Sequence, residues 1–381
     1  MLKRFEVSNY RTFEKMISID FSNVGGYQYN QDCLRENAMA KMIVYGRNAT
    51  GKTNLGRAIM DITEIALPLE VKRMSLLSNF LNADSNERFA FFKYVFQFGG
   101  DEVIYQYKKL SGQRLLDEQL FVNEKEIFFV NFEESIGFFP RLDIVDAETA
   151  VWERYQQSLD AMNEETAIGK NTLPFLRWLI NNTALQENSI LLKLDNYIKR
   201  MRMVQVGGIN RGYSVALNDL LSMEDNLEDF ERFLNVMGIE CKLKLETLPE
   251  GEKELYFVHN KLVPFWQTAS SGTKALADLY VKLNIGKEAS CMYIDEFDAF
   301  YHYEMSENVL KFFKAKYPKC QLILTTHNTN LMTNKLMRPD CLFILSRDGR
   351  LTALCDATER ELREGHNLEK LYISGEFEKF E

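Results

Sequence analysis

The sequence contains few residues of the kinds that form disulfides or bind transition metals. Its six cysteines are scattered through 381 residues without a C-x-x-C pair, and its four histidines have no spacing typical of metal ligands. A disulfide framework and a zinc centre are therefore excluded, and we expect reduced thiols of a cytosolic protein. The cysteines are Cys33, Cys241, Cys291, Cys320, Cys341 and Cys355, and the histidines are His259, His302, His327 and His366.

Long apolar runs and an excess of positive charge are also missing. No apolar run reaches the length that spans a membrane, and the N-terminus lacks a signal-peptide pattern, so we expect a cytoplasmic protein without a membrane partner. The formal net charge is −9, from 46 basic and 55 acidic residues. This balance gives no general attraction for nucleic acid, so such a contact would need a local basic patch.

The composition is that of a folded protein with a sizeable core. Hydrophobic residues make up 46% of the chain and aromatic residues 12%, which excludes disorder. The length is sufficient for one large domain or two smaller ones, and no internal repeat is visible.

One stretch near the N-terminus has the pattern of a phosphate-binding loop. It matches G-x-x-x-x-G-K-[ST] and consists of Gly46, Arg47, Asn48, Ala49, Thr50, Gly51, Lys52 and Thr53. The apolar run Met42–Tyr45 before it predicts a buried strand, and Asn54–Ile62 carries apolar residues at helical spacing. In a strand–loop–helix unit the backbone N–H groups face a triphosphate, so we expect ATP here, with Asn54 among its neighbours.

Two side chains of this loop have specific expected roles. Lys52 is expected to reach the β- and γ-phosphates of ATP, and the Thr53 hydroxyl is expected to ligate Mg²⁺. The alternative interpretation is a glycine turn that precedes a helix by chance. It is disfavoured because every fixed position of the motif matches in the expected context.

Two later strands end in side chains suited to phosphate chemistry. The apolar run Cys291–Ile294 leads to Asp295 and Glu296, which predicts a buried strand that delivers carboxylates to its C-terminal end. We expect Asp295 to hold Mg²⁺ through water and Glu296 to orient or deprotonate the attacking water. His327 ends the next such strand and is expected to donate a hydrogen bond to the γ-phosphate. The alternatives are a polar turn for the acids and an ordinary turn residue for the histidine.

The region around the phosphate loop is expected to contain antiparallel strands. Alternating residues predict a strand pair at 2–10 and 16–21, and aromatic-rich stretches predict further strands between residues 90 and 130. Arg11, in the first turn, is interpreted either as a nucleotide contact or as a solvated turn arginine. Gln97 and Gln106 are candidates for a magnesium-sensing loop, although ordinary strand residues are the favoured interpretation.

Helical spacing dominates from about residue 139 to residue 233. The short basic run Lys199–Arg202 in this segment is interpreted as a solvated helix face in preference to a nucleic-acid contact. A hidden nuclease site is a further alternative for this segment. Its four candidate carboxylates lack metal-ligand spacing and are read as surface residues: Glu153, Asp160, Glu164 and Glu165.

The motifs together resemble the ABC-type ATPase heads of the SMC, RecF and OLD-like families. A strand pair with Asn9-Tyr10-Arg11 precedes the phosphate loop, and Ser270–Thr273 stands where the ABC signature belongs. Asp298–His302 resembles the D-loop, and Thr325–Asn328 resembles the switch-histidine strand. The closing segment Leu371–Phe377 is similar to the tail of OLD-like ATPases found in bacterial antiphage defence.

This resemblance covers residues 1–135 and 240–381 and implies a fold. The expected class is an α/β P-loop NTPase of the ABC-ATPase head type, with a mixed central sheet, an antiparallel β subdomain and a helical insertion. The expected parts are an N-terminal half of the head at 1–137, the insertion at 138–236 and a C-terminal half at 237–381.

The resemblance also implies a dimer that holds two nucleotides between its subunits. Ser271 and Gly272 would then meet the γ-phosphate bound by the other subunit, and slow hydrolysis would act as a conformational switch. The signature departs from L-S-G-G-Q, with Ser270 for Leu, Thr273 for the second Gly and Lys274 for Gln. An anion-binding helix end and an ordinary Ser-Gly-Thr cap both fit these residues locally.

The expected function follows from this resemblance. OLD-family nucleases carry a TOPRIM domain after the ATPase, and none follows here, so a separately encoded effector is the expected partner, either a nuclease or a toxin. We expect a homodimer or higher oligomer that controls this effector in antiphage defence, with nucleic acid open as a further partner. The alternatives are a RecF-like repair ATPase that clamps DNA and a transporter subunit, which the N-terminal strand pair disfavours.

Overall fold

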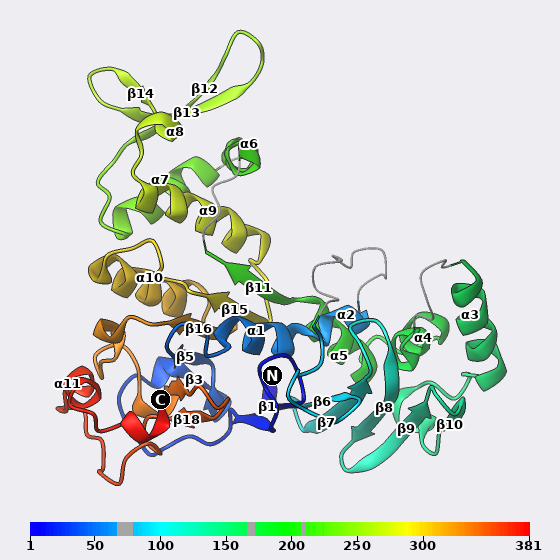
Figure 1. Cartoon of the computed structure of the whole chain (residues 1–381). Coiled ribbons are helices and arrows are strands. Elements are labelled where there is room, and N and C mark those ends of the chain that lie inside the picture. Colours follow the sequence, from blue (N-terminus) through cyan, green and yellow to red (C-terminus); the bar gives the residue numbers. More distant parts are fainter. Residues whose placement is uncertain (67–78, 166–171, 207–210, 224) are drawn as a thin grey trace.

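The computed structural model describes residues 1–66, 79–165, 172–206, 211–223 and 225–381, and Figure 1 shows their arrangement. Two large sheets form the body of the molecule. One is a six-stranded mixed sheet in the order β11-β15-β16-β5-β17-β18, and the other is a seven-stranded antiparallel sheet in the order β10-β9-β8-β7-β6-β1-β2. A three-stranded sheet and a short ribbon complete the described strands.

The mixed sheet contains the strands that carry the sequence motifs. Neighbouring strands from β11 to β17 run parallel, and β18 pairs antiparallel with β17. Four of these strands are buried at every residue, which explains their nearly continuous apolar sequences. The strands are β5 (Lys41–Tyr45), β11 (Met201–Gln205), β15 (Cys291–Asp295), β16 (Gln321–Thr326), β17 (Leu342–Leu345) and β18 (Leu351–Ala353).

The antiparallel sheet begins with the N-terminal strand pair and continues after the first helices. Its central strands β7 and β8 alternate between buried and half-buried residues, as expected of a sheet with one face on the core. The positive φ of 65° at Gly99 supplies the turn between β6 and β7. The strands are β1 (Leu2–Ser8), β2 (Ile17–Asp20), β6 (Ala90–Phe98), β7 (Asp101–Lys109), β8 (Leu115–Val122), β9 (Lys125–Asn131) and β10 (Ile136–Phe138).

Helices cover the sheets and connect them. Helix α1 follows the phosphate loop and packs against β11 and β15, whereas α2 packs against α4 and α5 beside the antiparallel sheet. The described helices are α1 (Lys52–Met60), α2 (Thr63–Ala66), α3 (Trp152–Glu165), α4 (Phe175–Asn182), α5 (Ile190–Lys199), α6 (Arg211–Leu221), α7 (Asn226–Val236), α8 (Phe265–Thr268), α9 (Ser271–Ile285), α10 (Tyr303–Lys316) and α11 (Leu368–Ile373).

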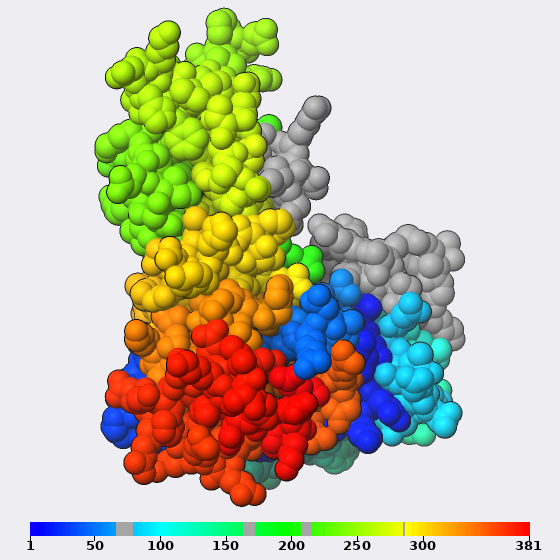
Figure 2. Space-filling model, turned by 60° about the vertical axis from the view of Figure 1, so that its left-hand side comes forward, coloured from blue at the N-terminus to red at the C-terminus, as the bar shows by residue number. Residues whose placement is uncertain are grey.

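One module projects from the body of the molecule. It comprises α6, α7 and the small sheet of β12 (Leu243–Thr247), β13 (Lys253–Val258) and β14 (Leu262–Pro264), followed by α8. Figure 1 shows it above α9 and α10, and Figure 2 shows the same residues as a separate lobe. Helix α9 links the module to the central sheet, because α6 and α7 pack on it and β15 follows it.

The structure confirms the predicted α/β class with a mixed sheet and an antiparallel sheet. The prediction of helical structure throughout 138–236 is wrong at Met201–Gln205. This segment is the edge strand β11, which pairs in parallel with β15, so the chain returns to the central sheet inside the expected insertion. The basic run Lys199–Arg202 therefore spans a helix end and a strand instead of one helix face.

In the ranges given above, no helix has both the length and the apolar character needed to cross a bilayer.

Candidate active site

The phosphate loop lies at the carboxyl end of β5, where the parallel strands β15 and β16 also end. Gly51 precedes α1 with φ of 101°, a conformation that favours glycine, and a Cβ there would lie 2.6 Å from the Thr12 hydroxyl. Arg47, Asn48 and Ala49 form the exposed side of the loop, whereas Thr50 is buried and its hydroxyl donates to the Arg47 carbonyl over 3.0 Å. The loop therefore presents its backbone to solvent in front of a helix N-terminus.

Lys52 is buried at the start of α1, and its ammonium group points back into the loop. Nζ donates to the carbonyl oxygens of Gly46 over 2.7 Å and of Arg47 over 3.1 Å. Burial lowers the pKa of Lys52, while the carboxylates of Glu296, Asp295 and Asp298 act in the opposite direction. The Lys52 ammonium group and the carboxylates of Glu296, Asp295 and Asp298 are therefore electrostatic neighbours in the structure.

Thr53 and Asp295 meet at the end of β15. The Thr53 hydroxyl donates to Asp295 Oδ2 over 2.6 Å, and the Thr325 hydroxyl donates to Asp295 Oδ1 over 2.8 Å. Asp295 is 5% exposed, so both of its oxygens are held in fixed positions between α1 and β16. The contact between Thr325 and Asp295 could not be predicted from the sequence, because it depends on the pairing of β15 with β16.

Glu296 follows β15 and is exposed. Its backbone adopts φ of 47°, which is uncommon for a residue other than glycine, and its N–H donates to the Thr325 hydroxyl over 2.8 Å. Thr325 therefore positions both acids. It contacts the side-chain carboxylate of Asp295 and the backbone N–H of Glu296. The strained backbone turns Glu296 away from the buried strand toward the open side of the site.

The donor set fits Mg²⁺ and a nucleotide triphosphate. A threonine hydroxyl and a carboxylate lie side by side, which are oxygen donors of the kind that Mg²⁺ prefers, and such sites usually complete the metal shell with water and phosphate. The helix N-terminus, the loop amides and Lys52 supply positive charge next to them. Thr53 and Asp295 are therefore the residues that would hold the metal.

His327 lies at the end of β16, close to the acids. It is exposed, and the preceding Thr326 hydroxyl donates to Asp298 Oδ2 over 2.8 Å. Burial raises the pKa of Asp298, whereas the hydrogen bond from Thr326 and the nearby His327 lower it. The histidine is thus placed at the open edge of the site and not in the core.

The signature residues lie at the exposed N-terminus of α9. The Ser270 hydroxyl accepts from the Thr273 N–H over 3.1 Å, which caps the helix, and Ser271 is exposed. Gly272 lies close to the D-loop residue Phe300, since a Cβ there would lie 3.2 Å from the Phe300 carbonyl oxygen. Within the described ranges, no hydrogen bond or ion pair joins Ser271 or Gly272 to the phosphate loop of the same chain.

The first turn of the chain contacts the phosphate loop through Thr12. Its hydroxyl accepts from Asn54 Nδ2 over 3.2 Å, beside Gly51. Arg11 is directed to Tyr10, where Nε donates to the phenol oxygen over 3.1 Å and the guanidinium carbon lies 5.5 Å from the ring centre. A contact between Arg11 and the nucleotide stays a prediction.

The C-terminal segment also reaches the loop. Arg47 forms an ion pair with Glu381, and Phe377 of the same segment is buried. This contact was not predicted from the sequence, because ion pairs between distant segments leave no local pattern.

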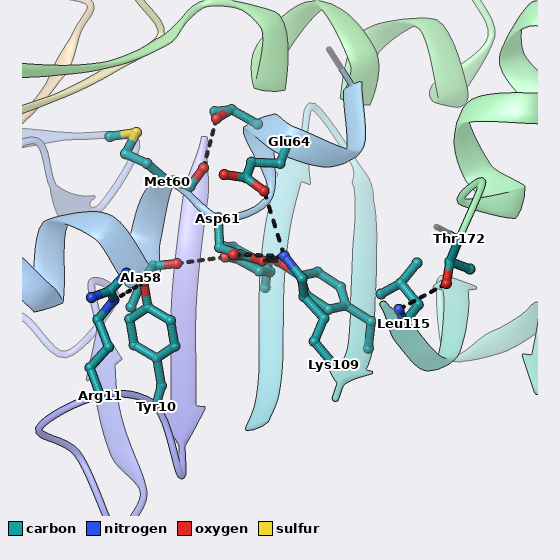
Figure 3. A network of polar contacts seen from close by, with 12 residues as sticks. Tyr10, Arg11, Ala58, Met60, Asp61, Glu64, Lys109, Leu115 and Thr172 are labelled. Atoms are coloured by element: carbon teal, nitrogen blue, oxygen red, sulfur yellow. Dashed lines mark hydrogen bonds and ion pairs between the residues drawn. The ribbon is translucent and has the colours of Figure 1, made fainter. Parts of the chain in front are cut away.

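A buried polar network connects α1 with the antiparallel sheet (Figure 3). Asp61, which ends α1, accepts from Lys109 Nζ of β7 over 2.8 Å and from the Tyr107 hydroxyl over 2.9 Å. Lys109 also lies 3.8 Å from Glu64, and Tyr94 of β6 donates to the Ala58 carbonyl over 2.9 Å. Charged and hydrogen-bonded contacts therefore tie the end of α1 to β6 and β7.

The remaining candidates lie away from this site. Gln97 and Gln106 are strand residues of the antiparallel sheet, and their amides donate to Gly99 and Gln119. Glu153 and Asp160 lie on α3, and among the described residues no three metal-ligating side chains gather.

The fold and the site define an α/β P-loop protein. Residues 41–333 match the family described as "AAA domain, putative AbiEii toxin, Type IV TA system", and the chain belongs to this family. A comparison with curated proteins gave no match.

Similar solved structures are heads of SMC proteins. One is an Smc head bound to the C-winged helix domain of ScpA, with 16% identity, a TM-score of 0.45 and coverage of 90% of this chain and 93% of that chain. Another is the SMC head domain from Thermotoga maritima, with 13% identity, a TM-score of 0.45 and coverage of 92% and 98%. A third, derived from Pyrococcus furiosus, is an Smc head with an extended coiled coil bound to the C-terminal domain of ScpA, with 16% identity, a TM-score of 0.45 and coverage of 92% and 95%.

Proposed function

We propose that this protein binds and hydrolyses ATP with Mg²⁺ at the phosphate loop. The observation that carries this proposal is the hydrogen-bonded set Thr53–Asp295–Thr325, with Lys52 and Glu296 beside it. Lys52 and the loop amides would bind the β- and γ-phosphates, and Thr53 and Asp295 would hold Mg²⁺, which supplies positive charge to the phosphate oxygens when bound. Glu296 orients the attacking water and accepts its proton, and His327 donates to the γ-phosphate.

We further propose that two copies form a nucleotide sandwich. Ser271 is exposed and Gly272 is half-buried at a helix N-terminus, and among the described residues neither has a hydrogen bond or ion pair with the chain's own phosphate loop. In the proposed dimer each copy's signature binds the γ-phosphate held by the other copy. ATP then closes the dimer and hydrolysis opens it.

The proposed biological role is control of a separately encoded effector, a nuclease or a toxin, in antiphage defence. The description of the matching family names a toxin and a type IV toxin–antitoxin system, which supports an effector pair. We retain the division into 1–137, 138–236 and 237–381 as part of this proposal, with β11 as the point where the middle segment rejoins the head. The projecting module of α6, α7 and β12–β14 is the surface proposed for the effector.

The experiment is co-purification with the products of neighbouring genes, followed by mass measurement with and without ATP. The Glu296→Gln variant is used because it is expected to hold the ATP-bound state. An assembly with a neighbour-encoded protein that depends on ATP supports effector control. A bare dimer that retains DNA would instead favour the RecF-like alternative, and a monomer in ATP would contradict the sandwich.

A further inference from the structure

A cleft lies at the edge of the central sheet opposite the phosphate loop. Its volume is about 810 Å³, and its lining includes Ala289 and Ser290 before β15, and Cys320 before β16. The same two strands end at Asp295 and Thr326 in the ATP site. A five-residue strand is about 16 Å long, so the cleft is separate from the phosphate loop while sharing its strands.

The cleft is basic although the chain as a whole is acidic. Six basic and two acidic side chains line it, in a protein whose formal net charge is −9. They converge from the ribbon of β3 (Leu34–Arg35) and β4 (Ala38–Met39), from α5, and from the loops before β15 and β16. The basic residues are Arg35, Lys193, Arg200, Lys287, Lys316 and Lys319, and the acidic residues are Glu36 and Glu288.

Among the residues that the structure describes, four of these six cations have no carboxylate partner. Arg35 pairs with Glu36 over 2.7 Å, and Lys316 lies 3.4 Å from Asp229. Within the described ranges, the other four basic side chains of the lining form no ion pair. Lys193, Lys287 and Lys319 are exposed, so their charges are available to an anion that enters the cleft.

A further cation is buried behind the wall. Lys41 is 1% exposed, and its ammonium group donates to the carbonyl oxygens of Tyr317 over 2.9 Å and Cys320 over 2.7 Å, both of which belong to residues of the lining. Burial lowers its pKa to about 8, with smaller opposing effects from neighbouring cysteines and Asp32. Lys41 adds positive potential to the cleft whenever it is protonated, because a low-dielectric wall screens little.

We propose that this cleft binds a nucleotide-like ligand that carries several phosphate groups. Several lysines and arginines in a concavity suit multiple phosphate oxyanions, and the volume falls within the range of about 300 to 1,000 Å³ typical of small-ligand sites. The half-buried Phe98 in the lining adds aromatic surface on which a base can pack. Because the site is concave, a small ligand or a strand end can enter it, whereas a flat protein or membrane surface cannot. The phosphates come either from a free nucleotide or from the end of a nucleic-acid strand.

The test measures binding of two probes while saturating Mg·ADP occupies the phosphate loop. The probes are a fluorescein-labelled, 5′-phosphorylated oligothymidylate, followed by anisotropy, and sodium tripolyphosphate, followed by calorimetry with Mg²⁺ in excess. The variant is Lys287→Glu/Lys319→Glu. The matched control is Lys125→Glu/Lys261→Glu, which changes net charge equally at exposed lysines outside the cleft.

The proposal predicts that the cleft variant weakens binding at least about tenfold and that the control does not. For the oligonucleotide, a plot of the logarithm of the association constant against the logarithm of the salt concentration has a negative slope. Its magnitude should decrease by about 1.4, because each phosphate that a lysine no longer neutralises removes about 0.7. Binding of tripolyphosphate alone identifies a free ligand, whereas oligonucleotide binding that tripolyphosphate does not displace identifies a strand. Equal weakening in both variants, or no binding of either probe, overturns the proposal. ATP turnover by the cleft variant is a separate readout, so failure here leaves the proposed ATPase untouched.

Discussion

At the scale of single residues, the buried Glu118 gives the protein a specific dependence on pH. Its carboxylate accepts from the Tyr105 hydroxyl over 2.7 Å and from the Leu176 N–H over 3.0 Å, which joins β8 to α4. Burial raises the pKa of Glu118 to about 7, and these hydrogen bonds lower it only in part. Near pH 6 the folded chain therefore holds a proton that the unfolded chain has released.

The free energy of unfolding should accordingly decrease as pH rises from about 4.5 to about 7. We predict that Glu118→Gln removes this contribution, which is on the order of 3 kcal/mol for a pKa shift of this size. The variant should match the wild type near pH 4.5 and exceed it above pH 7. Denaturant unfolding of both proteins across this range measures the difference, with Glu124→Gln as an exposed control. Parallel curves for wild type and Glu118→Gln would refute the role of Glu118.

Gly56 is a second residue whose identity the packing dictates. It lies on α1, where a Cβ would overlap the ring of Tyr293 on β15, and the Tyr293 hydroxyl donates to the Lys52 carbonyl. We predict that Gly56→Ala lowers the free energy of unfolding by about 1 to 3 kcal/mol because the core is overpacked. Thermal unfolding measures this decrease. Gly26→Ala is the control, since a Cβ there meets no atom within 4 Å, and equal melting temperatures for the two variants would contradict the packing argument.

At the scale of elements, the contact between α1 and β7 depends on a buried ion pair. Lys109 and Asp61 have side chains 3% and 5% exposed, with 2.8 Å between Nζ and Oδ1. We predict that Lys109→Met costs about 3 to 5 kcal/mol, because it leaves the Asp61 carboxylate buried without its cation. Lys108→Met on the same strand is the matched control. The Lys108 side chain, which pairs with Asp117, is 35% exposed, so its loss should lower the free energy of unfolding by less than about 1 kcal/mol.

A double-mutant cycle separates this pair from general damage to the fold. Asp61→Asn added to Lys109→Met should recover part of the stability, since the buried charge is then removed and Tyr107 keeps an acceptor. Denaturant unfolding of the four proteins gives the coupling energy. Additive effects of the two substitutions would show that the pair does not couple α1 to the sheet.

The elements that could be predicted are those with a strong local pattern. The strand Cys291–Asp295 and the loop before α1 were predicted because continuous apolar runs and a fixed motif are both contained in a few residues. Strand β11 was not predicted, because Met201–Gln205 mixes basic and apolar residues. This segment becomes a strand only by pairing with β15, which is far away in the sequence. The contacts of Thr325 with Asp295 and Glu296 were not predicted for the same reason, although both acids were.

At the scale of the whole molecule, the proposed sandwich predicts complementation between two inactive variants. Lys52→Ala removes the phosphate contact, and Ser271→Arg blocks the signature, so neither homodimer should hydrolyse ATP. A mixed dimer contains one site built from an intact loop and an intact signature. An equal mixture should therefore recover about a quarter of the wild-type activity if subunits exchange freely and sites work independently. No recovery after demonstrated subunit exchange would contradict a site shared between copies.

The arrangement of distant segments is the part that sequence patterns do not specify. The basic cleft gathers Lys193, Lys287 and Lys319 from three parts of the chain that come together only in the folded protein. The ion pair between Arg47 and Glu381 likewise joins the phosphate loop to the end of the chain. Both features depend on the packing of helices around the central sheet, which local spacing does not determine.

The most direct test of the proposed activity compares ATP binding with ATP turnover in Glu296→Gln. The amide keeps the size of the side chain but cannot accept the proton of the attacking water, so turnover should fall by at least about a hundredfold. ATP affinity should stay close to that of the wild type, because Lys52, Thr53 and Asp295 are unchanged. Glu304→Gln, on the exposed start of α10, is the control and should hydrolyse ATP normally. Turnover by Glu296→Gln near the wild-type rate would show that this carboxylate does not carry the reaction.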